Sequence, residues 1–276
     1  MSVSNFIPEL WSKRINQKLR KSLVFGSVVN TDYEGEIGSG GDTVKINSIG
    51  DVTIGNYVPN STNITPEQLN DYQTTLLIDQ KKYFAFKVDD VDKAQVNANV
   101  MDEAMQSAAW GLKNAADESI AALYTDAGNT ITTTAIDSTN AFAAVLTLGQ
   151  YLSQENVPED GRWLVVPPWF KTKLLLAKAL VTDNGAAADA FTNGKVGRVG
   201  GFDLYESNNI SNDGTTYYIM AGTRKAISFA AQVNKVEAYR PEASFSDAVK
   251  GLYVYGTKVV YPDALAVLTA TVGSEP

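Results

Sequence analysis

The residue types that most often carry out catalysis and bind metals are missing from this sequence. Its 276 residues include no histidine and no cysteine. Without histidine, the chain lacks the commonest general base and transition-metal ligand. Without cysteine, it has no thiol nucleophile, no disulfide and no thiolate for zinc or an iron–sulfur cluster. Catalysis by paired carboxylates, lysine or magnesium remains possible, but losing both residue types argues strongly against an enzyme. We therefore expect a protein that is not an enzyme, with no catalytic residue, cofactor or metal.

Pairs of adjacent acidic residues are the remaining candidates for catalysis by carboxylates. Asp89/Asp90 and Glu159/Asp160 are two such pairs. Side chains adjacent in sequence project in different directions, and acids usually face solvent, so these pairs are weak evidence for a hydrolase. The run Asp89-Asp90-Val91-Asp92 also lacks the ligand spacing of an EF-hand loop. Acids in this arrangement are typical of a helix start, where they cap free backbone N–H groups.

A glycine-rich segment at residues 35–41 has the composition, but not the context, of a phosphate-binding loop. Four of its seven residues are glycine. A Walker-type loop continues through Gly-Lys-Ser/Thr into a helix, whereas Thr43-Val44-Lys45-Ile46 is typical of a strand. Ser39 does not fit a nucleophile elbow, because Ile37 stands where a glycine is required. We interpret the segment as a loop with high backbone freedom.

Charge is distributed unevenly along the chain. The net charge is −8, which argues against a general nucleic-acid binder. Residues 1–30 nevertheless carry +4, because one acid, Glu9, stands against five basic residues, and the remainder carries −12. The basic residues are Lys13, Arg14, Lys18, Arg20 and Lys21. This segment could contact an acidic partner, or its charges could form the solvated face of an amphipathic helix.

Two segments in the first third of the chain are predicted to need a partner surface. Residues 6–29 place apolar side chains every three to four positions, which indicates an amphipathic helix. Residues 43–88 predict a long hairpin, with an outgoing strand over 43–57, a polar tip over 58–71 and a return strand over 72–88. A short terminal helix and an isolated hairpin are each marginally stable alone. We therefore expect both to pack on another surface.

The longest predicted element is a helix that follows the cap Asp89-Asp90-Val91-Asp92 and runs to about Asp126. This stretch contains one glycine and no proline, and its apolar residues keep a helical spacing. About 34 residues would make a helix roughly 50 Å long. Such a helix needs a large sheet or partner subunits to cover its apolar side.

The remaining elements mix helices and strands without a regular order. The pattern predicts helices over 140–155 and 169–180, a loop over 182–198, and strands over 163–166, 200–207, 217–221, 226–233 and 252–272. This indicates an α+β class without the alternation of a doubly wound sheet and without a repeat. No apolar run is long enough to span a membrane, and the N-terminus does not read as a secretory signal, so we expect a cytoplasmic setting.

The order of these elements resembles the major capsid proteins of tailed bacteriophages, which share the Hong Kong 97 fold. None of the segments that carry the resemblance is a chemical motif, and their order and spacing make it specific. They are Phe6-Ile7-Pro8-Glu9-Leu10-Trp11, Val29-Asn30-Thr31-Asp32-Tyr33-Glu34-Gly35, Gly41-Asp42-Thr43-Val44, Val88-Asp89-Asp90-Val91-Asp92-Lys93-Ala94-Gln95, Val196-Gly197-Arg198-Val199-Gly200-Gly201-Phe202 and Glu206-Ser207-Asn208.

The resemblance implies a domain organisation and a function. The domains would be an N-terminal arm (1–42), an extended β-hairpin loop (43–88), a peripheral domain with a long spine helix (89–138) and C-terminal strands (240–276), and an axial domain (139–239). The chain would self-assemble as pentamers and hexamers into the icosahedral phage head around double-stranded DNA. It would assemble in the bacterial host cytoplasm and reside in the virion.

The resemblance also implies partners and contact residues. We see no scaffold-like segment ahead of the arm, so we expect a separate scaffolding protein, a portal, weak non-specific contact with packaged DNA, and no membrane. We expect subunit contacts at Trp11, Lys13, Arg14, Lys18, Arg20, Lys21, Tyr57, Pro59, Tyr72, Lys81 and Lys82.

Two alternative functions fit the sequence less well than a shell protein does. The main alternative is another virion structural protein, such as a tail or connector component, although one long helix beside a long hairpin favours the shell. A lectin-like module using Tyr253, Tyr255 and Tyr261 is disfavoured, because such aromatic residues are typical of cores and interfaces.

Overall fold

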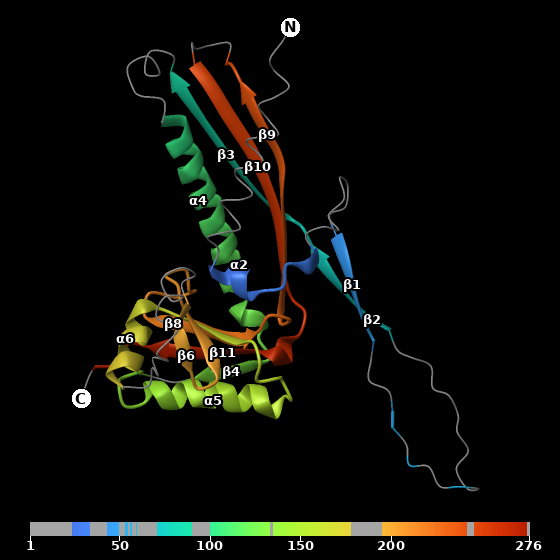
Figure 1. The fold of residues 1–276 in the computed structure, drawn as a ribbon, viewed down its shortest axis with the longest axis vertical. Coiled ribbons are helices and arrows are strands. Elements are labelled where there is room, and N and C mark those ends of the chain that lie inside the picture. The colour runs from blue at the N-terminus through green and yellow to red at the C-terminus, as the bar shows by residue number, and fades with distance from the viewer. Residues whose placement is uncertain are drawn as a thin grey trace.

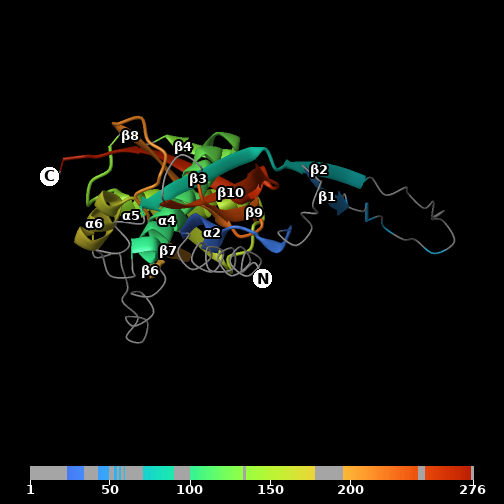
Figure 2. The ribbon, with the colours of Figure 1, turned by 90° about the horizontal axis from the view of Figure 1, so that it is seen from above.

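The structure is a computed structural model that describes residues 24–33, 43–49, 53–54, 56, 59, 71–89, 100–132, 135–177, 195–241 and 246–274. A long helix and a three-stranded sheet form an elongated upper part in Figure 1, and a six-stranded sheet with its helices forms the lower part. A two-stranded ribbon projects to one side in both Figure 1 and Figure 2. Within the described residues, no helix is both long and apolar enough to cross a membrane.

The six-stranded sheet follows the order β4-β11-β8-β5-β7-β6. Its strands are β4 (Asn129–Thr132), β5 (Arg162–Val166), β6 (Lys195–Val199), β7 (Phe202–Glu206), β8 (Thr216–Thr223) and β11 (Leu265–Thr271). Every residue of β5 is buried, as expected of a strand that is covered on both faces. One face packs on α5 (Ala141–Gln154) and α6 (Pro168–Leu176) through an apolar cluster that includes Leu148, Leu164 and Phe170.

The opposite face of this sheet joins the lower part to the upper part. Trp163 and Val267 on the sheet belong to the same apolar cluster as Leu112 and Ile120 of α4 (Val100–Ala121). A short 3₁₀ helix, η3 (Ala122–Asp126), continues α4 toward the sheet. Because one cluster extends across both parts, they share a core instead of meeting through a polar interface.

The three-stranded sheet of the upper part lies against α4 (Figure 1). Its order is β3-β10-β9, with β3 (Gln80–Asp89), β9 (Ile227–Tyr239) and β10 (Ser246–Val259) all antiparallel to their neighbours. Phe84, Phe86 and Tyr253 share an apolar cluster with Met105 of α4. The short helix α2 (Val24–Val28) also packs on α4.

The projecting ribbon consists of β1 (Thr43–Ile49) and β2 (Asp71–Leu77), paired antiparallel with Thr43 opposite Leu77. Its base is held by a small apolar cluster in which Val44, Leu76 and Val254 are buried together. The ribbon therefore starts from β10 of the upper part and leads away from it.

The structure confirms the α+β class and most of the predicted elements after residue 138. The helix predicted over 140–155 is α5, and the strand predicted over 163–166 is β5. The helix predicted over 169–180 appears as α6, with its last residues outside the described part of the chain. The loop prediction over 182–198 is wrong at its end, because Lys195–Val199 is edge strand β6, paired with β7.

The predicted return strand of the long hairpin is wrong in its pairing. Residues 71–77 do pair with the outgoing strand, but residues 80–89 pair with β10. The chain changes partner around Ile78, which is buried in the cluster at the base of the ribbon. The predicted hairpin is therefore a ribbon followed by the edge strand of a separate sheet.

The predicted cap of the long helix is wrong at Asp89. Asp89 is the last residue of β3 and lies opposite Ser246, so it does not cap a helix. The alternation of β3 continues through Asp89, and pairing with β10 outweighs its capping preference. Residues 90–99 lie outside the described residues, and α4 begins at Val100. The predicted end is confirmed, because η3 ends at Asp126.

Candidate functional site

The face of the three-stranded sheet that points away from α4 exposes large apolar side chains. Side chains alternate along a strand, so Phe84 and Phe86 pack toward α4 whereas Tyr83 lies on the other side and is 81% exposed. Leu252 of β10 lies directly opposite Tyr83 and is also exposed. Tyr239, on the neighbouring strand β9, is exposed as well. Grouped exposed apolar side chains are typical of a surface that binds another protein.

The same sheet face carries basic side chains. Lys81 and Lys87 alternate in step with Tyr83 along β3 and are exposed. Lys250 of β10 places its Nζ 3.0 Å from Oε2 of Glu237 and 5.2 Å from the centre of the Tyr239 ring. We define the basic sheet face as Lys81, Tyr83, Lys87, Glu237, Tyr239, Lys250 and Leu252. Its three lysines and one glutamate give it a positive charge.

The base of the β1–β2 ribbon is fixed to β10 at very close range. A Cβ on Gly256 would lie 2.1 Å from the carbonyl oxygen of Leu77, so only glycine fits where β10 passes the end of β2. Leu76 is fully buried there, whereas the side chain of Leu77 is 54% exposed. The ribbon is thus anchored at its base, where Leu77 is exposed beside the buried cluster.

Four of the predicted contact residues lie within the described part of the chain. Lys81 and Lys82 are exposed on β3, Pro59 is an exposed turn residue, and Tyr72 lies in β2. Only Lys81 belongs to the basic sheet face, because Lys82 has the opposite alternation. The others lie outside the described residues: Trp11, Lys13, Arg14, Lys18, Arg20, Lys21 and Tyr57.

Sequence reasoning missed the residues that complete the basic sheet face. Tyr83, Leu252 and Tyr239 come from three strands and meet only because β10 pairs with both β3 and β9. One signal in the sequence could have revealed the Tyr83 side of β3. Polar and apolar residues alternate there, with Lys81, Tyr83 and Lys87 on the solvent side and Phe84 and Phe86 on the core side.

Residues 24–30 are anchored at the junction of the upper and lower parts. Val29 is fully buried, and its carbonyl oxygen accepts a hydrogen bond from Nε of Arg224 at 3.2 Å. Asn30 exchanges two backbone hydrogen bonds with β9, at 2.9 and 2.8 Å. These contacts lie within the predicted arm (1–42) and follow its five basic residues, so they fix the end of the basic segment on the subunit.

A buried carboxyl group lies beside this anchored segment. Asp117 of α4 is only 1% exposed, and its Oδ1 accepts no hydrogen bond. Burial raises the pKa of Asp117 to about 6, although the backbone N–H groups of Val24 and Phe25, the Lys113 ammonium and the Asn209 side chain favour its charged form. The sequence did not indicate this group, because its burial depends on segments distant along the chain.

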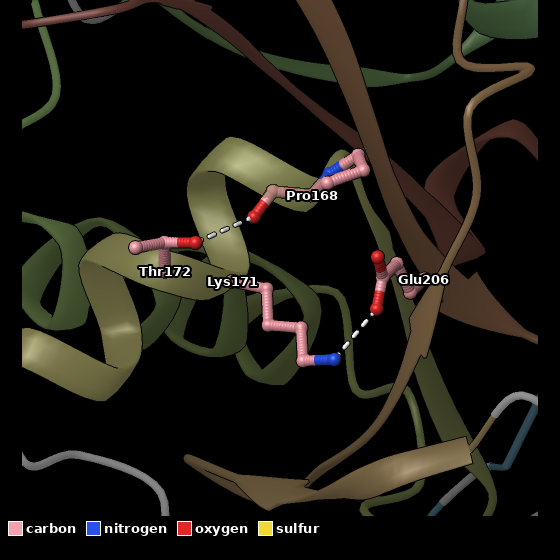
Figure 3. A network of polar contacts seen from close by, with 4 residues as sticks. All are labelled: Pro168, Lys171, Thr172 and Glu206. Carbon is pink, nitrogen blue, oxygen red and sulfur yellow. Dashed lines mark hydrogen bonds and ion pairs between the residues drawn. The ribbon is translucent and has the colours of Figure 1, made fainter. Parts of the chain in front are cut away.

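An ion pair fastens α6 to the six-stranded sheet (Figure 3). Nζ of Lys171 lies 2.6 Å from Oε2 of Glu206, at the end of β7. The Thr172 hydroxyl donates to the carbonyl oxygen of Pro168 at 3.1 Å, within the first turn of α6. These contacts orient the helix on the sheet, and they leave Lys171 engaged within its own chain.

The described acidic residues do not assemble a catalytic or metal centre. Asp89 ends a strand, Asp90 lies outside the described residues, and Glu159 and Asp160 are exposed between α5 and β5. No group of three or more acidic side chains gathers to hold a metal ion in the part of the chain that the structure describes. Tyr253 and Tyr255 are buried, so they form no sugar-binding face.

Comparisons with known proteins show the family to which the chain is similar. A family model described as phage capsid protein matches residues 73–269. A structure from Mycobacterium phage Che8 is 29% identical, with a TM-score of 0.72 over 97% of this chain and 94% of that chain. No curated protein sequence matches the chain.

More distant structures share the fold. The capsid of the cyanophage P-SCSP1u is 18% identical, with a TM-score of 0.71 over 92% of this chain and 90% of that chain. A virus-like particle from Pyrococcus furiosus is 13% identical, with a TM-score of 0.58 over 95% of this chain and 99% of that chain. The same architecture is thus found in particle-forming chains with few identical residues.

Proposed function

This chain belongs to the phage capsid protein family, and we propose that its copies close into an icosahedral shell by seating residues 50–70, within the extended loop of one copy, on the basic sheet face of the next. The chain is a structural protein of the virion, a major capsid protein that assembles with copies of itself, and it is not an enzyme. The family match favours this shell over the tail or connector component considered from the sequence.

The observation that carries the proposed contact is the exposure of Tyr83 within a basic surface. Tyr83 is 81% exposed beside lysines on a sheet whose other side is packed. Exposed tyrosine and leucine side chains supply the apolar area that a protein contact needs, and a surrounding rim of charge gives it orientation.

The part of the extended loop between β1 and β2 carries the complementary charge. Residues 50–70 contain two acids, Asp51 and Glu67, and no lysine or arginine. The basic sheet face has three lysines and one acid, so the two surfaces attract. β1 and β2 lead away from their own three-stranded sheet (Figure 1), which favours the sheet of a second copy as the partner of this loop.

The basic N-terminal arm supplies a second proposed contact. Its lysines and arginines would bind an acidic patch on an adjacent subunit or on a separate scaffolding protein. The anchoring of residues 24–30 supports this role, because a fixed base lets the preceding residues reach a neighbour in a defined direction.

The domain division remains part of the proposal. An axial domain over 139–239 would contain β5, β6, β7, β8 and β9, and a peripheral domain would contain α4 and β10, whereas β3 falls almost entirely in the range of the extended loop. β4 and β11 come from the ranges given to the peripheral domain but belong to the six-stranded sheet, so the two domains would share that sheet. We further propose pentamers and hexamers, a portal, weak non-specific contact with packaged double-stranded DNA, and assembly in the host cytoplasm.

Charge reversal tests the loop contact. Lys81→Glu combined with Lys87→Glu should prevent closed particles in electron micrographs while the subunit stays folded by circular dichroism. Adding Asp51→Lys and Glu67→Lys should restore particles, because the attraction is re-established with exchanged signs. Lys225→Glu is the matched control, since Lys225 is exposed in the turn between β8 and β9. Normal particles from the first double variant would refute the proposed contact.

A further inference from the structure

Asp117 lies where three separate segments of the chain meet. It is on α4, and it faces the start of α2 through the backbone N–H groups of Val24 and Phe25. The side chain of Asn209, from the segment after β7, reaches the same carboxyl group. With 1% of its surface exposed and one oxygen without a hydrogen bond, Asp117 occupies a strongly desolvated position.

Few charged groups are available to compensate this carboxylate. Lys113 is one turn earlier on α4 and faces it. Glu118 follows it on α4 but is exposed and accepts a hydrogen bond from Asn114 at 2.7 Å. Neither α2 nor the segment 207–210 contains a charged residue. Burying the charged form is therefore unfavourable, whereas the protonated form fits the site.

We propose that Asp117 is a proton-controlled latch, in which protonation of its buried carboxyl group tightens the docking of residues 24–30 against α4 and ionisation loosens it. When α2 separates from α4, water reaches the carboxylate and stabilises its charge. When α2 docks, the carboxylate must either lose that water or take up a proton. Docking of this segment is thereby coupled to proton uptake.

The direction and size of the coupling follow from the two protonation equilibria. The pKa of Asp117 is about 6 in the docked state, against 3.8 for a hydrated carboxyl group. The stabilisation from protonation is complete below the lower value and is lost as the pH rises through the higher one. A pKa difference of this size corresponds to roughly a hundredfold change in the docking equilibrium, of which about tenfold falls between pH 5.0 and 7.5.

The latch has a consequence for the arm contact. Residues 24–30 anchor the arm after its five basic residues, so their docking sets whether the basic segment is held in one direction. This consequence rests on the arm contact proposed above, whereas the latch itself is a property of one chain. Failure of the arm contact would leave the pH dependence of docking intact.

Hydrogen exchange measured by mass spectrometry tests the latch on shells formed by the full chain. Exchange of a peptide covering residues 24–33, corrected for the intrinsic effect of pH, should be about tenfold slower at pH 5.0 than at pH 7.5. Asp117→Asn keeps the size and the acceptor oxygen but cannot ionise, so its exchange should be slow at both values. Glu118→Gln, next to it on α4, should retain the wild-type difference.

A second variant covers the case in which Asp117→Asn does not fold. Lys113→Gln removes the cation that favours the charged carboxylate, so the midpoint of the pH dependence should move to higher pH. Equal corrected exchange at pH 5.0 and 7.5 in the wild type would overturn the latch. A pH difference that survives in folded Asp117→Asn, or an unmoved midpoint in Lys113→Gln, would do the same.

Discussion

The ring of Tyr124 stacks on the ring of Tyr218, with centroids 4.0 Å apart and planes only 9° from parallel. Tyr124 lies in η3 at the end of α4, and Tyr218 lies in β8 of the six-stranded sheet. The stack therefore joins the upper and lower parts of the subunit at their shared core. A shell subunit must transmit contacts made at its edges through such a junction.

The first prediction concerns this stack. In a double-mutant cycle with Tyr124→Leu and Tyr218→Leu, the free energy of unfolding should show a coupling of about 1 kcal/mol, the usual value for a stacked aromatic pair. Urea denaturation of the two single variants and the double variant measures it. Strict additivity would mean that the rings contribute only their buried area.

The second prediction concerns the base of the ribbon. Gly256→Ala should displace β2 from β10, because the added carbon would overlap the carbonyl oxygen of Leu77. We expect a loss of about 1–3 kcal/mol in subunit stability, as for other overpacked sites, together with impaired particle formation. Gly111→Ala is the control. It has open space on α4 and should be neutral or slightly stabilising by calorimetry.

The third prediction concerns a buried guanidinium. Arg162 is 5% exposed and donates to the carbonyl oxygens of Pro158, at 2.9 Å, and Val157, and to the Ser153 hydroxyl. Arg162→Lys would keep a buried charge with fewer donors, and should lower the unfolding free energy by about 2–4 kcal/mol. Arg198→Lys, on an exposed side chain, should change it by less than about 0.5 kcal/mol. Similar melting shifts for the two variants would contradict this role.

The fourth prediction concerns the ion pair of α6. Both side chains of the Lys171–Glu206 pair are about one-third exposed, so solvent screens their attraction. Lys171→Met should therefore cost about 1 kcal/mol or less, and the difference from wild type should shrink as salt is raised. Thermal unfolding at low and high salt measures this difference. A loss that is large and independent of salt would assign Lys171 a packing role instead.

The fifth prediction concerns the basic arm. Replacing its five basic residues, from Lys13 to Lys21, with glutamine should impair assembly while circular dichroism shows a folded subunit. The reason is that the arm contributes charge to a contact between chains and little to its own fold. If electron microscopy shows that this variant forms normal shells, the basic residues of the arm are not needed for assembly and the prediction is wrong.

Local patterns in the sequence predicted the elements whose structure depends on nearby residues. The helical spacing of 140–155 and the apolar run of 163–166 correspond to α5 and β5 almost residue for residue. By contrast, β3 has the alternation of a strand, but nothing near it indicates that β10, about 160 residues later, is its partner. Edge strand β6 was missed because its short segment is polar and contains Gly197.

The same physical limit applies to the candidate site. Lys81 was predicted because its charge and its place on a strand are local properties. Its neighbours Tyr239 and Leu252 come together with it only through long-range pairing. Asp117 lies on a face that would be solvated if α2 did not cover it, so its burial depends on a contact between distant segments.

The most direct test of the account is a cryo-electron microscopy reconstruction of shells formed by the full chain. We predict that residues 50–70 of one subunit lie across the basic sheet face of the next, covering Tyr83 and placing Asp51 or Glu67 within ion-pair distance of Lys81 or Lys87. A closed shell in which that face is open to solvent and the loop contacts another surface would contradict the proposed contact.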